Sequence, residues 1–267
     1  MLGKLIGYET KAFGRIMLPL YGAALAFALF TGLSIRFIPE ETMSGLPGVL
    51  IFMIYTVLLL AIIIMTCVLS VTRFYKNLLG AEGYLMFSLP VSTAEHIVSK
   101  VISVLIWTAL SSAVSLLSFI LTALGAGGFE PFRDFFEIFK HPEIMEKLPS
   151  AIGVTSLILL IIITGTAASI VRIYAGISIG HQFNDHRILF SIVALVAFNV
   201  IGTILTSILS ATGNCFGLCH SISKIFEADT LAGIYAAMGS AIVFLLVQVL
   251  FFGAMTWFLL DRKLNLE

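Results

Sequence analysis

The sequence predicts an all-α integral membrane protein with six transmembrane helices preceded by an N-terminal amphipathic interfacial helix. Of the 267 residues, 59% are hydrophobic and only 11% are charged, whereas soluble domains carry about 25% charged residues. The mean hydropathy of +1.08 is too high for a water-soluble globule of this size. Long uncharged runs alternate with short charged segments. The net charge of zero and the lack of a basic stripe argue against nucleic-acid binding.

The first fifteen residues are expected to form a helix that lies in the membrane interface. Apolar side chains share one helical face, and cations occupy other positions. The apolar residues are Leu2, Leu5, Ile6 and Phe13, and the cations are Lys4, Lys11 and Arg15. Residues 1–15 have neither an apolar core nor a small-residue cleavage site, so we do not expect a cleaved signal peptide. A short disordered leader is the alternative.

Six segments are long and apolar enough to cross the hydrocarbon core as helices. They are residues 16–35, 49–71, 101–124, 151–171, 188–209 and 234–260. Each is apolar on all sides, and the alternating pattern of a β-barrel is absent from the sequence. We therefore expect residues 1–267 to form a single transmembrane domain, with the lipid bilayer as its surroundings.

The distribution of lysine and arginine predicts the orientation. The N-terminal segment, the 72–100 loop, the 172–187 loop and the C-terminus together hold ten of these cations, and the other connections hold five. Cytoplasmic loops are the richer in Lys and Arg. We therefore expect a multi-pass protein of the cell membrane with both termini in the cytoplasm.

The 72–100 loop is too apolar for a simple solvated linker. Aromatic and leucine residues recur at helical spacing on both sides of a turn at residues 80–83, and Pro90 ends this piece. Ser92 and Glu95 then have the spacing of a capping box that starts a new helix. A short apolar helix on a cytoplasmic loop must pack against the bilayer interface or a protein partner.

Three segments resemble bacterial ABC-transporter permeases of the type-2 export family, a group common in Gram-positive bacteria. Residues 73–92 (RFYKNLLGAEGYLMFSLPVS) resemble the family's first cytoplasmic loop, although the family typically has Asp at the position of Ala81. The other two segments are residues 180–187 (GHQFNDHR) and 262–267 (RKLNLE). The amphipathic start and the six spans also match the family plan, so the likeness covers essentially the whole chain.

The resemblance implies that the first cytoplasmic loop couples the permease to a separate ABC ATPase subunit. The residues that it assigns to this coupling loop are Lys76, Asn77, Leu78, Leu79, Gly80, Glu82, Gly83, Tyr84, Phe87 and Pro90. A second cytoplasmic contact would comprise His181, Asp185 and Arg187. Because Ala81 removes a charge that the family often has, electrostatic docking should be weaker at that point.

The same resemblance implies a dimer, formed with a second permease copy or with a sister permease. The sequence contains no G-x-x-x-x-G-K-[ST] loop, so ATP and Mg²⁺ are expected on the partner subunit and no cofactor on this chain. An amphiphilic cargo is expected: an antimicrobial peptide, a drug or a lipid-like molecule. The alternative is an ATPase-independent membrane scaffold or sensor whose 72–100 loop binds another partner.

Other polar residues suggest no catalytic or metal site. The spacing of His181 and His186 separates the two imidazoles by about 140° on a helix, which favours a solvated turn over a metal site. Arg172 is expected to reach the headgroups at the end of the fourth span. Asn199 and Gln248 are expected to form hydrogen bonds between helices.

Three expectations concern the segments outside the membrane. Cys215 and Cys219 are a candidate disulfide, which spacing alone leaves open. Residues 129–147 are expected to form an amphipathic helix on the outer leaflet, because four phenylalanines share one face. By resemblance to the exporter family, residues 209–231 are expected to dip back into the membrane.

Overall fold

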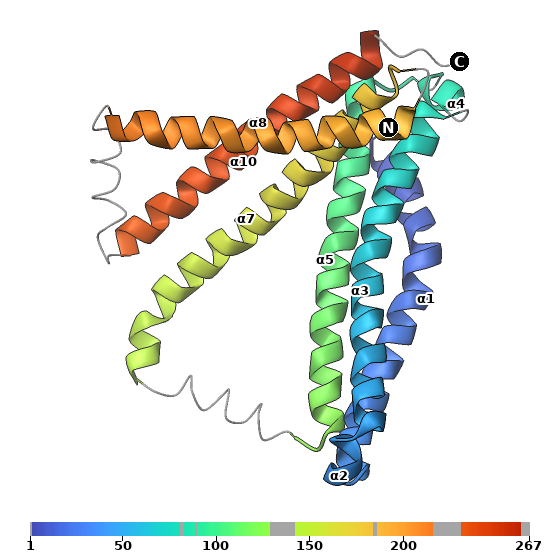
Figure 1. The fold of residues 1–267 in the computed structure, drawn as a ribbon, viewed down its shortest axis with the longest axis vertical. Coiled ribbons are helices and arrows are strands. Elements are labelled where there is room, and N and C mark those ends of the chain that lie inside the picture. Colours follow the sequence, from blue (N-terminus) through green and yellow to red (C-terminus); the bar gives the residue numbers. More distant parts are fainter. Residues whose placement is uncertain are drawn as a thin grey trace. The chain divides into compact units, whose positions relative to one another are not determined.

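The computed structural model describes residues 2–80, 83–88, 90–128, 142–183, 186–215 and 231–262, and over these ranges the chain is helical without strands. The helices are α1 (Leu2–Phe37), α2 (Glu40–Met43), α3 (Leu46–Phe74), the π-helix η1 (Tyr75–Leu79), α4 (Gly83–Phe87), α5 (Thr93–Gly125), α7 (Pro142–Gly180), α8 (Arg187–Cys215) and α10 (Leu231–Arg262) (Figure 1).

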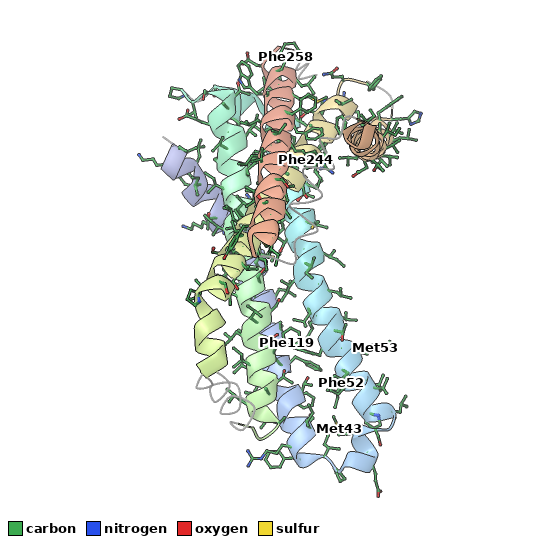
Figure 2. The ribbon with its side chains drawn as sticks, turned by 90° about the vertical axis from the view of Figure 1, so that its left-hand side faces the viewer. Met43, Phe52, Met53, Phe119, Phe244 and Phe258 are labelled. Atoms are coloured by element: carbon green, nitrogen blue, oxygen red, sulfur yellow. The ribbon has the colours of Figure 1, made fainter. Side chains whose placement is uncertain are left out.

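Six of these helices are long and apolar enough to cross a membrane, which confirms the predicted fold class. The candidate spans are Leu2–Phe37, Leu46–Leu79, Thr93–Gly125, Pro149–Gly180, Arg187–Ile204 and Gly233–Asp261. Large apolar side chains stand exposed along them, including Phe52, Met53 and Phe119 (Figure 2). Exposed apolar surface of this extent is typical of helices that face lipid. The chain is a multi-pass membrane protein.

The chain divides into two compact units. The first comprises Met1–Thr72 and Val98–Glu146, and the second comprises Arg73–Ile97 and Lys147–Glu267. The first unit therefore contains α1, α2 and most of α3 and α5. The second contains η1, α4, α8, α10 and most of α7.

In the first unit, buried hydroxyl groups connect α5 to its two neighbours, α1 and α3. The Ser111 hydroxyl lies 2.7 Å from the Tyr21 hydroxyl of α1 and 3.2 Å from Oγ1 of Thr66 in α3. Further along α5, the Ser118 hydroxyl lies 2.9 Å from the hydroxyl of Tyr55 in α3. Buried polar groups in apolar helices need such partners, so these contacts help to fix the three helices together.

Residues 2–15 are helical, as expected, and continue into the first span without a break. Lys4, Lys11 and Arg15 are exposed, whereas Phe13 is buried and stacks on Trp107 of α5, with 6.1 Å between ring centroids. A carboxylate occupies the same buried face. Oε1 of Glu9 lies 2.6 Å from Nζ of Lys100, which α5 buries instead of leaving it in the predicted 72–100 loop.

In the second unit, α7 contacts both α8 and α10. The side chain of Leu195 in α8 lies against Gly176, and Gly253 of α10 lies near Val171. The Tyr235 hydroxyl of α10 donates to the Ser150 carbonyl over 3.2 Å. The helix continues to Gly180, so the prediction that a loop begins at residue 172 was wrong.

Two predicted segments lie largely outside the described residues. The expected helix over 129–147 is described only from Pro142 onward, as part of α7. The expected re-entrant segment over 209–231 overlaps α8 only as far as Cys215. Both expectations stay predictions.

Candidate functional site

The segment that follows α3 changes direction through η1 and a glycine turn. A π-helix has a wider turn than an α-helix and occurs often at functional sites. It ends at Gly80, and the Gly83 amide donates a hydrogen bond of 2.8 Å to the Gly80 carbonyl. A Cβ atom at Gly80 would lie 2.8 Å from the Lys76 carbonyl oxygen, so the turn favours glycine there. The turn predicted at residues 80–83 is confirmed.

Two contacts attach this segment to the end of α7. The rings of Phe74 and Tyr174 are both buried and stack with 3.9 Å between centroids and an interplanar angle of 7°. Nε2 of His181 lies 2.9 Å from the Leu79 carbonyl oxygen. Since a carbonyl oxygen only accepts, Nε2 must carry the proton and donate it. Residues 74–79 are therefore joined to the end of α7 by a ring stack and a hydrogen bond.

Beyond the turn, α4 presents two large apolar side chains. Tyr84 is 62% exposed and Leu85 is 74% exposed, on a helix of five residues. The chain is fixed again just after it, because the Glu95 carboxylate accepts from the Ser92 amide over 3.1 Å and the Ser92 hydroxyl accepts from the Glu95 amide over 3.3 Å. The predicted capping box is confirmed. An exposed apolar element thus lies between two fixed points.

The residues that the sequence assigned to the coupling loop differ in their exposure to solvent. Lys76, Tyr84 and Pro90 are exposed, Asn77 and Gly80 are half-buried, and Leu78, Leu79 and Gly83 are buried. Glu82 and the side chain of Phe87 lie outside the described residues. The exposed residues are the ones available to a partner, whereas the buried leucines hold the loop in place.

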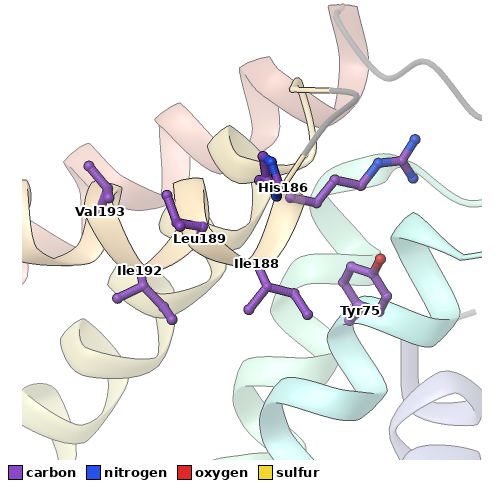
Figure 3. Close-up of a pocket in the computed structure, with 7 residues that line it drawn as sticks. Tyr75, His186, Ile188, Leu189, Ile192 and Val193 are labelled. Carbon is purple, nitrogen blue, oxygen red and sulfur yellow. The ribbon is translucent and has the colours of Figure 1, made fainter.

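The residues of the second predicted contact differ in their surroundings. His181 is buried and bound to Leu79, so it joins the two predicted contacts to each other. Arg187 begins α8 and lines an open apolar hollow of about 630 Å³, together with Tyr75 of η1 (Figure 3). Asp185 lies outside the described residues, as do Cys219 and the side chain of Cys215, so the candidate disulfide stays a prediction.

The same unit contains a polar cluster that sequence reasoning did not assemble. Arg172 donates through one guanidinium nitrogen to Oδ1 of Asn199 over 3.2 Å and through the other to Oε1 of Gln248. The expectation that Arg172 extends toward the headgroups was therefore wrong. In the predicted topology, α7 ends, α8 begins and α10 ends on the cytoplasmic side of the membrane. Comparing how far Arg172, Asn199 and Gln248 lie from that side could have indicated the cluster.

Loss of the His181 ring should loosen the attachment of the coupling loop. In His181→Leu the Leu79 carbonyl would lose its donor, which costs about 1–3 kcal/mol for a buried group. We expect amide hydrogen exchange over residues 75–88 to accelerate about tenfold. His186→Asn is the control, because His186 is exposed and asparagine tolerates its φ of 61°. Equal exchange in the two variants would show that the bond does not hold the loop.

Comparisons of this chain with protein-family models, curated proteins and solved structures found no match.

Proposed function

We propose that this chain is the membrane-spanning permease subunit of an ABC exporter in the cell membrane. It forms the translocation pathway as a dimer, with a second copy or a sister permease, and both termini lie in the cytoplasm. Separate ATP-hydrolysing subunits bind its cytoplasmic loops and carry the ATP and Mg²⁺. The cargo is amphiphilic. The resemblance of residues 73–92 to the coupling loop of such permeases motivates this proposal.

The geometry of α4 is the observation that carries the proposal furthest. A coupling element needs an exposed surface for the ATPase and a firm connection to the transmembrane helices. Tyr84 and Leu85 supply the surface, since exposed apolar patches mark interaction sites and tyrosine is enriched among the residues that dominate binding. The Phe74–Tyr174 stack and the His181–Leu79 hydrogen bond supply the connection to α7.

A charge on α4 should release the ATPase subunit. In Leu85→Glu, docking would bury a carboxylate in an apolar cleft, and a loss of about 2 kcal/mol or more corresponds to binding roughly 30-fold weaker. The protein is purified in detergent from its native membrane, and copurifying chains that carry a G-x-x-x-x-G-K-[ST] motif and their ATP hydrolysis are quantified. Both should fall at least tenfold in the variant.

The matched control is Leu46→Glu. Leu46 is 72% exposed at the start of α3, on a connection predicted to face the outside. ATPase recovery should be unchanged in this control. Equal recovery from the wild type and both variants would contradict coupling through α4. A different result would favour the ATPase-independent scaffold or sensor: a copurifying partner that lacks the G-x-x-x-x-G-K-[ST] motif and is lost only in Leu85→Glu.

The proposed orientation can be tested at the same element. In a background without the native cysteines, Tyr84→Cys should resist a membrane-impermeant maleimide in intact cells and react in inside-out vesicles. Labelling in intact cells would place α4 outside and contradict the proposal.

A further inference from the structure

A cavity of about 590 Å³ lies in the second unit beside the polar cluster of Arg172, Asn199 and Gln248. Its lining comes from α7, α8 and α10 and is mostly aromatic and aliphatic, with Phe198 and Phe252 in contact with each other. Arg172 is the one charged residue among the described residues that line it. The size and the few convergent polar groups are typical of small-molecule sites.

The cluster lies well inside the apolar helices. Gln248 is next to the middle of the apolar span Gly233–Asp261 of α10. Asn199 is twelve residues after the start of α8, and Arg172 is eight residues before the end of α7. At a rise of about 1.5 Å per residue, these positions are about 12–20 Å from the helix ends. An ionisable side chain at such depth is costly and is typically functional.

Among the residues that the structure describes, no acidic side chain compensates the positive charge of Arg172. Its hydrogen-bond partners are the neutral amides of Asn199 and Gln248, and its Cζ lies 5.6 Å from the ring centroid of Phe252. In the part of the chain that the structure describes, its buried Nε has no hydrogen-bond partner and no carboxylate forms an ion pair with it. The two amides orient the guanidinium but leave it with donors and charge for an anion.

We propose that this cavity binds an amphiphile with an oxyanion headgroup, a phosphate or a carboxylate, and an apolar tail. Arginine binds both headgroups through two parallel N–H donors. The aromatic lining receives the tail, and removal from water strengthens the attraction between headgroup and guanidinium. This proposal rests on the proposed export function in one respect only: the bound amphiphile is the cargo of the permease.

The test measures binding to the purified full-length chain, without any ATPase, in a neutral detergent by native mass spectrometry. The probes are dodecyl phosphate, dodecyltrimethylammonium and inorganic phosphate. Dodecyl phosphate should bind at least tenfold more tightly than dodecyltrimethylammonium, and inorganic phosphate should not compete at equal concentration. Equal affinity for the two dodecyl probes would overturn the proposal. Effective competition by inorganic phosphate would overturn the role of the tail.

Two variants remove the charge and the space separately. Arg172→Gln should weaken dodecyl phosphate binding at least tenfold, whereas Arg15→Gln, which removes an exposed arginine of α1, should not. Gly202→Phe keeps Arg172 and fills the cavity, because Gly202 lines it and a Cβ atom there meets nothing within 4 Å. Gly239→Phe is its control, since that Cβ also meets nothing and Gly239 does not line the cavity.

Gly202→Phe decides the outcome if Arg172→Gln does not fold. Binding that survives in Gly202→Phe, or that falls equally in Gly239→Phe, would overturn the cavity as the site. This test does not depend on the proposed export function, because the affinities are measured on the chain alone. Selective binding of dodecyl phosphate, together with no ATPase copurifying from the native membrane, would retain the site and contradict the permease.

Discussion

Replacement of Lys100 by methionine should destabilise the protein by about 3–5 kcal/mol, the range measured when one partner of a buried ion pair is removed. Nζ of Lys100 lies 2.6 Å from Oε1 of Glu9, and the two side chains are 4% and 9% exposed. The variant would leave the carboxylate of Glu9 buried without that cation. Thermal unfolding in detergent should show a midpoint lower by on the order of 10 °C.

A second substitution should reverse most of this loss. In Glu9→Gln with Lys100→Met neither member of the pair is charged, and neutral replacements of buried ion pairs are often close to neutral in stability. Lys11→Met is the control, because Lys11 belongs to the same helix and is exposed. If Lys100→Met unfolds at the temperature of Lys11→Met, the ion pair contributes nothing to the packing of α1 against α5.

The Glu9–Lys100 pair illustrates which part of a membrane fold a single sequence contains. The apolar face of residues 2–15 follows from helical periodicity, and Phe13, which was assigned to that face, is buried within the protein. Glu9 falls on that same face between Ile6 and Phe13, which indicates a buried carboxylate in need of a cation. Its partner is 91 residues away along the chain. Only the packing of α1 against α5 selects Lys100.

The same distinction separates the parts of the candidate site. The turn from Gly80 to Gly83 and the capping box of Ser92 and Glu95 depend on hydrogen bonds between residues three apart, so local patterns predict them. The attachment of Leu79 to His181 joins residues 102 apart. Neither the residues around Leu79 nor those around His181 indicate this hydrogen bond. The sequence therefore assigned His181 to a separate contact.

The positive charge of Arg172 led to a wrong prediction of where the fourth helix ends. A positive residue after an apolar run usually marks the membrane interface, so the span was expected to end at residue 171. However, the residues from 173 to 180 are mostly apolar, and α7 includes them. Asn199 and Gln248 supply acceptors for Arg172 within the helices, which removes the need to reach the headgroups.

Small residues provide the second large expected effect, at the crossing of α1 and α5. A Cβ atom at Gly32 would lie 2.4 Å from the Thr122 carbonyl oxygen and 2.9 Å from Cα of Gly125. These are backbone atoms, so the clash can be relieved only by moving the helices apart. Separation would also stretch the 3.1 Å hydrogen bond from Oγ1 of Thr122 to the Ala28 carbonyl. Close approach through small residues drives helix association in membranes.

Gly32→Ala should therefore destabilise the protein by about 3 kcal/mol, the upper end of the usual cost of overpacking. Gly22→Ala in the same helix should instead stabilise it slightly, by up to about 1 kcal/mol, because a Cβ atom there meets nothing within 4 Å and alanine favours the helix. Unfolding in detergent should thus shift in opposite directions for the same chemical change. A shift of equal sign and size in both variants would mean that helix propensity, and not the contact between α1 and α5, determines the response at Gly32.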